Sequence, residues 1–143
     1  MNTFGTNSRN ELDTAAPILQ EIAFTVLAIK DHSVLKGHRN EVEQNAAYNA
    51  KPQRSKLKFP NGKHNELPSR AIDVQTWPVP QGDTKEQTEQ LLREDQLYLL
   101  GLYVGVAAQI GVILRSGADW DRDGEIADNG WDDLFHIEMV AST

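Results

Sequence analysis

A run of eighteen residues without a charged side chain, residues 97–114, restricts the fold of this 143-residue chain more than any other feature. A stretch of this length can cross a membrane as a single helix. However, it contains Gln109 and three glycines, and a helix can end near Gly111 with a strand after it. We therefore expect a buried helix that runs into a core strand, and no stable membrane insertion.

Composition and charge narrow the class of protein further. Hydrophobic residues make up 39% and charged residues 24% of the chain, which suits one globular domain over residues 1–143. The net charge of −7 argues against a nucleic-acid partner or an anionic membrane, because both need a basic face. The chain has no cysteine, so a disulfide framework and a thiol nucleophile are excluded, and any metal must use histidine and carboxylate ligands.

Capping signals, proline positions and hydrophobic periodicity predict a mixture of helices and strands. Helices are expected near residues 8–14, from about 16 onward, and over 40–50 and 84–110, with capping boxes at Ser8 with Glu11, Asn40 with Glu43 and Thr84 with Gln87. Strands are expected at 33–36, 70–75, 112–115 and 134–140. Because these elements do not alternate regularly, the pattern predicts an α+β fold with a small, largely antiparallel sheet flanked by helices.

Side-chain alternation predicts which residues face away from the core. Successive residues of a strand point to opposite faces, so Ile72 and Val74 share one face and Asp73 points to the other. In the last predicted strand, three apolar residues alternate with His136 and Glu138, which therefore face the other side. The three apolar residues are Phe135, Ile137 and Met139. Two strands of one sheet would then place Asp73 and His136 on the same open face.

Histidine and carboxylate positions predict a metal site on that face. The chain has four histidines, at positions 32, 38, 64 and 136. A catalytic zinc usually takes three protein ligands and keeps a fourth position for water. His64 lies nine residues before Asp73, in the loop that leads into its strand, and we predict zinc binding by His64, Asp73 and His136. From spacing alone, a surface or hydrogen-bonding role for His136 stays open, and His32 and His38 are expected to be structural or exposed.

Several motifs resemble those of one peptidase family. Residues 63–74, KHNELPSRAIDV, resemble the first metal motif of the bacteriophage L-alanyl-D-glutamate peptidases, which belong to the D-alanyl-D-alanine carboxypeptidase superfamily of zinc peptidases. Residues 133–138, DLFHIE, resemble the second motif, an acidic residue three positions before a histidine. Gly37-His38-Arg39 with Gln44 resembles the family's Gly-x-Arg…Gln segment. Departures at Gly62, Phe135 and residues 75–77 concern the pocket walls and leave substrate preference open.

The resemblance implies a fold, a reaction and a set of roles. It implies a helix-flanked antiparallel sheet, hydrolysis of amide bonds in peptidoglycan stem peptides, zinc ligation by His64, Asp73 and His136, and Asp133 as the general acid and base. A turn or capping role is the alternative for Asp133. Arg39 is a candidate to hold a substrate carboxylate or stabilise the oxyanion, because its fork matches carboxylate geometry, and a plain salt bridge is its alternative. Glu138 either orients a ligand or is a solvated edge residue.

An acidic segment before the second motif matches the start of a calcium loop. Such a loop has carboxylates at positions 1, 3 and 5 and glycine at position 6. In this chain these positions hold Asp119, Asp121, Asp123 and Gly124. The usual glutamate at position 12 is replaced by Gly130, for which Asp128 or Asp132 could substitute. A turn rich in aspartate and glycine is the alternative to a calcium site.

Three functions fit these observations. The first is a phage lysis endolysin that cuts between L-alanine and D-glutamate of the stem peptide. The second is a D-alanyl-D-alanine carboxypeptidase or dipeptidase, and the third is a metal-stabilised wall-binding module without turnover. Residues 1–5 lack a basic start and an apolar run, so we expect no signal peptide. A lysis enzyme without one would accumulate in the host cytoplasm until release to the cell wall. We also expect a monomer.

Overall fold

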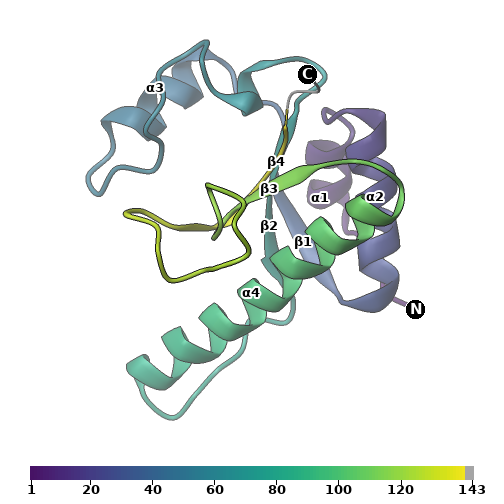
Figure 1. The fold of residues 1–143 in the computed structure, drawn as a ribbon, viewed down its shortest axis with the longest axis vertical. Coiled ribbons are helices and arrows are strands. Elements are labelled where there is room, and N and C mark those ends of the chain that lie inside the picture. Colours follow the sequence, from purple (N-terminus) through teal and green to yellow (C-terminus); the bar gives the residue numbers. More distant parts are fainter. Residues whose placement is uncertain (141–143) are drawn as a thin grey trace.

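The part of the chain that the structure describes forms an α+β fold, as predicted, with four α-helices and one sheet (Figure 1). The computed structural model describes residues 1–140. Its elements are α1 (Thr6–Leu12), α2 (Pro17–Ile29), β1 (His32–Lys36), α3 (Glu41–Asn49), the 3₁₀ turn η1 (Lys63–Asn65), β2 (Ala71–Thr76), α4 (Lys85–Gln109), β3 (Leu114–Gly117) and β4 (Asp133–Met139).

The sheet is antiparallel throughout, with the strand order β1-β2-β4-β3. Helices α1, α2 and α4 cover one face of it, and α3 lies on the other side (Figure 1). The core fills the space between the sheet and α2 and α4. Its fully buried members include Leu19, Ile22, Val26, Ile72, Val74, Leu99, Tyr103 and Ile137. One face of the sheet is thus committed to the core and the other is available for a site.

The uncharged run forms a helix followed by a core strand, as its composition predicts. It makes up the second half of α4, where Leu99, Tyr103 and Ala107 are buried, and it ends at Leu114, the first residue of β3. Gly111 adopts a φ of +78° in the turn between them, a conformation that glycine enters without steric cost. Within residues 1–140, no helix is both long and apolar enough to cross a membrane.

Two of the three predicted capping boxes are present. Asn40 and Glu43 cap α3, and Thr84 and Gln87 cap α4, each pair through reciprocal side-chain to backbone hydrogen bonds. The predicted capping box at Ser8 is wrong, because α1 begins two residues earlier, after Gly5. The Ser8 hydroxyl is buried and accepts a hydrogen bond of 3.0 Å from the backbone N–H of Val34 in β1. The Ser8 hydroxyl therefore bonds to a neighbouring strand and does not cap its own helix.

The strand register sets up the open face. Asp73 pairs directly with His136, while Ile72 pairs with Ile137 on the core side. The pairing of β3 with β4 shifts between Ser116 and Gly117, so the regular alternation of β4 stops before its first residues. The expectation that Phe135 faces the core is consequently wrong, since Phe135 lies outside the core cluster and lines a cavity beside Asp133.

Candidate metal centre and active site

Three side chains meet on the open face of the sheet, where β2 and β4 pair. Asp73 and His136 are cross-strand neighbours, and His64 comes from η1 just before β2. His64 Nε2 lies 3.1 Å from Asp73 Oδ1 and 3.3 Å from His136 Nδ1. His136 Nδ1 lies 3.4 Å from Asp73 Oδ1. The structure thus brings together the three residues that the sequence predicts as zinc ligands.

The size of this triangle fits a zinc ion. Ligand atoms placed about 2.0–2.1 Å from a tetrahedral zinc are separated by roughly 3.3–3.4 Å. The three observed separations, 3.1, 3.3 and 3.4 Å, correspond to one face of such a tetrahedron. Two imidazoles and one carboxylate are also a ligand set of catalytic zinc sites, in which the fourth position stays open.

Hydrogen bonds on the far side of each imidazole select the nitrogen that faces the centre. His64 Nδ1 lies 2.6 Å from the carbonyl oxygen of Gly37 and donates to it, so Nε2 carries the lone pair. His136 Nε2 lies 2.8 Å from Glu138 Oε1 and donates to it, so Nδ1 carries the lone pair. Partners of this kind fix the tautomer and the orientation of metal-binding histidines.

The charges around the centre favour a cation there. Burial alone would raise the pKa of Asp73, but the imidazoles of His64 and His136 outweigh it and hold that pKa far below its usual value. Burial alone would lower the pKa of His136, but hydrogen bonds that its imidazole makes to the carboxylates of Asp73 and Glu138 raise that pKa to about 9. A proton on His136 or a metal ion between the three side chains would supply the positive charge that these carboxylates stabilise.

Asp133 lies at the start of β4, half-buried beside the centre. It lines the same cavities as Asp73 and the two histidines. The backbone N–H of Phe135 donates to its Oδ1 at 3.1 Å, and Oδ2 accepts no hydrogen bond from residues 1–140. Burial and the nearby charge of Asp73 raise the pKa of Asp133 above its usual value. A carboxyl group with a raised pKa in a cavity is suited to accept and return a proton.

Gly117 allows Asp133 to take this position. A Cβ atom at residue 117 would overlap the carbonyl oxygen of Asp133 and lie 2.7 Å from its carbonyl carbon. The close approach occurs at the register shift between β3 and β4, where Gly117 pairs with Asp133. Only a residue without a side chain permits the two backbones to come this close.

Arg39 is engaged with the metal centre and not free in the cavity. Its Nη2 lies 3.2 Å from Asp73 Oδ2, and its Nη1 lies 3.2 Å from Gln44 Oε1. Gln44 is buried and also donates to the Ser55 hydroxyl at 2.8 Å. These contacts describe a residue that orients the Asp73 carboxylate, with Gln44 as its support.

A second chain of contacts leads from His136 to the loop between β3 and β4. Glu138 accepts from Arg115 Nη2 at 2.7 Å, and the guanidinium of Arg115 lies over the Trp120 ring at 5.8 Å. The Trp120 ring stacks on that of Trp131 with centroids 5.9 Å apart and lies 5.5 Å from the ring of His136. Burial would raise the pKa of Glu138, but His136 and Arg115 lower it to about 2.

The acidic segment forms a compact turn in this loop. Carboxylate oxygens of Asp119, Asp121 and Asp123 lie within 4.8 Å of one another. Asp119 accepts from the backbone N–H groups of Asp123 and Gly124, at 3.1 and 2.9 Å. Asp128 joins a second group with Asp123 and Glu125. By contrast, Asp132 is bonded to Asn129 and lies 3.9 Å from Arg93.

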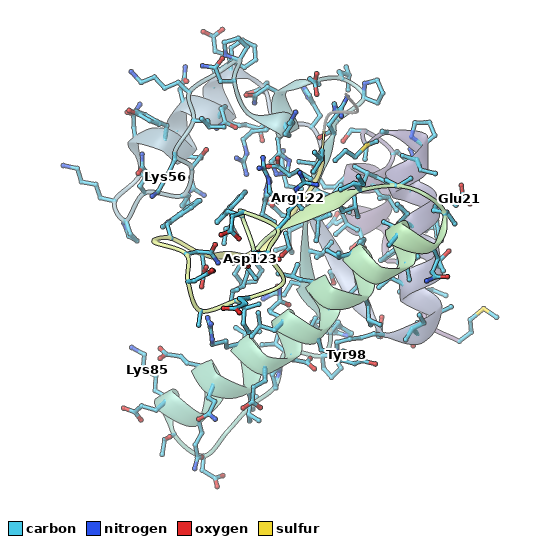
Figure 2. The ribbon with its side chains drawn as sticks, viewed as in Figure 1. Glu21, Lys56, Lys85, Tyr98, Arg122 and Asp123 are labelled. Carbon is cyan, nitrogen blue, oxygen red and sulfur yellow. The ribbon has the colours of Figure 1, made fainter. Side chains whose placement is uncertain are left out.

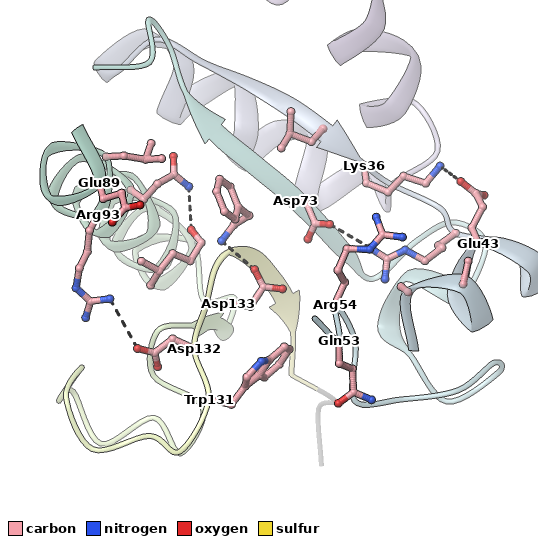
Figure 3. A pocket seen from close by; sticks show the side chains of 18 of the residues that line it. Lys36, Glu43, Gln53, Arg54, Asp73, Glu89, Arg93, Trp131, Asp132 and Asp133 are labelled. Atoms are coloured by element: carbon pink, nitrogen blue, oxygen red, sulfur yellow. Dashed lines mark hydrogen bonds and ion pairs between the residues drawn. The ribbon is translucent and has the colours of Figure 1, made fainter. Parts of the chain in front are cut away.

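Two cavities of about 940 and 610 Å³ open beside the centre. The larger one contains Asp73 and the smaller one His64 and His136. Both are lined by Arg39, Arg54, Trp131 and Asp133, so they adjoin beside the candidate metal centre. Figure 3 shows the larger one, with Arg54, Trp131 and Asp133 labelled. One wall is the segment after α3, which carries Lys56, and the other is the loop that carries Asp123 (Figure 2).

Sequence reasoning missed several supporting residues. The partner of His64 is the backbone carbonyl of Gly37, whose role no side-chain pattern can report. Arg115 and Trp120 reach the site only through the fold. Gly117 lies two residues beyond the strand predicted at 112–115, so it did not stand out as a strand glycine, which often marks a bulge or a close approach of two backbones.

The fold and the site define a class of protein, a small α+β protein with a candidate His–Asp–His metal centre in an open groove. The family model described as phage L-alanyl-D-glutamate peptidase matches residues 1–140, and the chain belongs to this family. The membership expected from the motifs is therefore confirmed.

Two relatives illustrate the similarity. The chain is 30% identical over 142 residues to the L-alanyl-D-glutamate peptidase of Escherichia phage T5, covering 96% of this chain and 97% of that protein. The crystal structure of the Serratia marcescens L-Ala D-Glu endopeptidase ChiX matches with a TM-score of 0.65 and 17% identity, over 97% of this chain and 91% of that one. At this low identity, the second match supports the fold alone.

Proposed function

We propose that the protein is a zinc-dependent peptidoglycan peptidase that hydrolyses the bond between L-alanine and D-glutamate in stem peptides. The observation that carries this proposal is the triangle of His64 Nε2, Asp73 Oδ1 and His136 Nδ1 with Asp133 beside it. The family of the chain and the name of its phage T5 relative indicate which bond is cut. Peptidoglycan stem peptides are therefore the partner that we propose.

A zinc ion at this centre would supply Lewis acidity and a nucleophile formed from water at neutral pH. Asp133 would accept the proton of that water at Oδ2 and return it to the amine of the leaving glutamate. Gly37 and Glu138 would hold the two imidazoles in the metal-binding tautomer, and Arg39 would hold Asp73. Arg39 would act on a substrate oxyanion only if its bonds to Asp73 and Gln44 rearranged.

The arrangement of the cavities favours an endopeptidase over a carboxypeptidase. A carboxypeptidase must enclose the end of its substrate, whereas an enzyme that cuts within a chain needs space on both sides of the bond. Asp73 lines the larger cavity, His64 and His136 line the smaller one, and Asp133 lines both, so two spaces border the proposed acid and base. Release of D-alanine as the main product would favour the carboxypeptidase alternative.

The test is an analysis of the amino termini released from purified peptidoglycan by wild type and Asp133→Asn, with the zinc content of both proteins measured. We expect new D-glutamate amino termini from wild type, and a rate about 10²–10⁴ lower for the variant with zinc retained. Exposed Asp83, outside the site, gives a matched control as Asp83→Asn. Zinc binding without any cleavage by wild type would favour a non-catalytic wall-binding module.

We further propose that calcium binds Asp119, Asp121 and Asp123 and orders the loop that ends at Asp133. The grouping of their carboxylates supports this, as does the contact of Trp120 with His136. A calcium-selective chelator should then lower activity while zinc stays bound, and Asp121→Asn should reduce that response. Activity that is unchanged by the chelator would contradict the proposal.

Location and assembly follow from the proposed role. A lysis enzyme of a phage would remain in the host cytoplasm until its release to the cell wall. We also expect a monomer, which size-exclusion chromatography with light scattering would test at working concentrations.

A further inference from the structure

We infer that Arg54 recognises the free carboxylate of the substrate's glutamate residue and so helps to select the bond that is cut. Arg54 lies in the segment after α3 and lines both cavities. In the larger cavity its side chain and that of Asp133 come from separate segments of the wall (Figure 3). This inference rests on the proposed function and adds a residue that determines its specificity.

The location of Arg54 distinguishes it from the other basic residues near the centre. It lines both cavities, together with Arg39, Trp131 and Asp133. Any peptide that extends through both cavities must therefore pass beside its side chain. Lys56 and Lys63, by comparison, line only the smaller cavity.

The charge of Arg54 is also available. Within residues 1–140, four basic residues that line the cavities have carboxylate partners: Lys36 with Glu43, Arg39 with Asp73, Arg93 with Asp132, and Arg115 with Glu138. Arg54 makes no ion pair in this part of the chain, and its side chain is exposed. A guanidinium without a protein partner at the entrance to a site can bind an anionic group of the substrate.

The backbone of Arg54 is held in place. Its N–H donates to the carbonyl oxygen of Ala47 at the end of α3, at 3.0 Å, and the next N–H, of Ser55, donates to the same oxygen at 3.2 Å. Gln44, which supports Arg39, bonds the Ser55 hydroxyl at 2.8 Å. The same buried amide therefore links the positions of Arg39 and of the segment that carries Arg54.

The chemistry of the substrate provides the matching anion. When glutamate contributes its amine to the scissile amide, its α-carbon carries one carboxyl group and its side chain a second. Onward linkage of the peptide uses only one of the two, so one carboxylate remains close to the leaving nitrogen. A guanidinium can bind it through two parallel hydrogen bonds, and an amidated glutamate would lack the charge.

The test compares two synthetic stem peptides that differ only in this group, a free carboxylate or its primary amide, for wild type and Arg54→Gln. We expect wild type to prefer the acid. In the variant, KM for the acid should rise roughly 10- to 100-fold, with kcat less affected and the preference lost. Lys58→Gln is the matched control, because Lys58 is exposed on the same segment and lines neither cavity.

The outcomes separate the inference from the proposed function. Cleavage by wild type with the acid preference unchanged in Arg54→Gln would overturn the inference and leave the function intact. An equal loss in Lys58→Gln would overturn it as well, since net charge alone would then explain the effect. If wild type cleaves neither peptide, the proposed function fails. In that case, calorimetry of the acid and amide peptides with wild type and Arg54→Gln tests the inference. Wild type should bind the acid more tightly than the amide, and Arg54→Gln should show no such preference.

Discussion

At the scale of single residues, the centre depends on the hydrogen-bond partners of its two imidazoles. His64 presents Nε2 because Gly37 takes its Nδ1–H, and His136 presents Nδ1 because Glu138 takes its Nε2–H. The two rings therefore use different nitrogens for the same purpose. This difference follows from their origins, since one ring comes from a turn and the other from a strand.

Replacing Glu138 tests the importance of this orientation. Glu138→Gln keeps the size of the side chain and removes the charge that stabilises the Nε2–H of His136 and pairs with Arg115. We expect zinc affinity and kcat/KM each to fall about 10- to 100-fold, measured by metal competition and peptide hydrolysis. Glu66→Gln removes an exposed ion pair with Arg70 and serves as the control. Unchanged zinc affinity in Glu138→Gln would show that the contact is incidental.

At the scale of elements, the irregular pairing of β3 with β4 positions the proposed acid and base. The register shift brings Gly117 against Asp133, and β4 then continues in regular pairing with β2 from His136 onward. Asp133 and His136 therefore belong to the same strand, but Asp133 lies in its irregularly paired part and His136 in its regularly paired part.

A side chain at residue 117 should disturb this arrangement. Gly117→Ala places a methyl group against the backbone of Asp133, and we expect a loss of about 1–3 kcal/mol in unfolding free energy together with a loss of activity. Gly101→Ala is the control, because its site in α4 is exposed with open space around it, and it should stabilise by about 0.5–1 kcal/mol. Denaturant unfolding and peptide hydrolysis measure both effects, and full activity in Gly117→Ala would contradict the role of the close approach.

The sequence predicts regular elements well and irregular contacts poorly. Alternation in β2 places Asp73 opposite the core correctly, because β4 pairs with that strand regularly at Ile72 and Asp73, although the pairing with β1 shifts between Val34 and Lys36. The same alternation fails at Phe135, where the register shifts. Capping at Ser8 fails for a related reason, since a partner in another element takes its hydroxyl. Local patterns cannot report either contact, because each depends on residues distant in sequence.

At the scale of the whole molecule, the sheet separates stability from chemistry. Its covered face carries the core, and its open face carries the candidate metal centre and both cavities. The other two histidines, His32 and His38, are not part of the candidate metal centre. His32 is buried between Tyr103, whose hydroxyl lies 2.6 Å from Nε2, and the carbonyl oxygen of Lys30, 2.9 Å from Nδ1, while His38 is half-buried.

His32 should make stability depend on pH. Burial is the main cause that lowers its pKa from 6.5, so the folded state keeps it neutral where the unfolded state takes up a proton. The unfolded state thus binds more protons as the pH falls below about 6.5, and the unfolding free energy declines by at most about 1.4 kcal/mol per pH unit.

Denaturant midpoints between pH 7.5 and 5.5 check this, with the difference between wild type and His32→Gln isolating the contribution of His32. The variant should lose part of the decline, because it lacks the buried imidazole. Parallel curves for wild type and His32→Gln would contradict the prediction.

The central claim is that His64, Asp73 and His136 hold one zinc ion that hydrolysis requires. The most direct measurement is to remove metal from the purified protein and follow the release of D-glutamate amino termini from peptidoglycan as zinc is added back. Activity should rise in proportion to zinc and level off at about one equivalent, and His136→Ala should show no such rise. Full activity in the metal-free protein, or an unchanged titration in His136→Ala, would contradict the account.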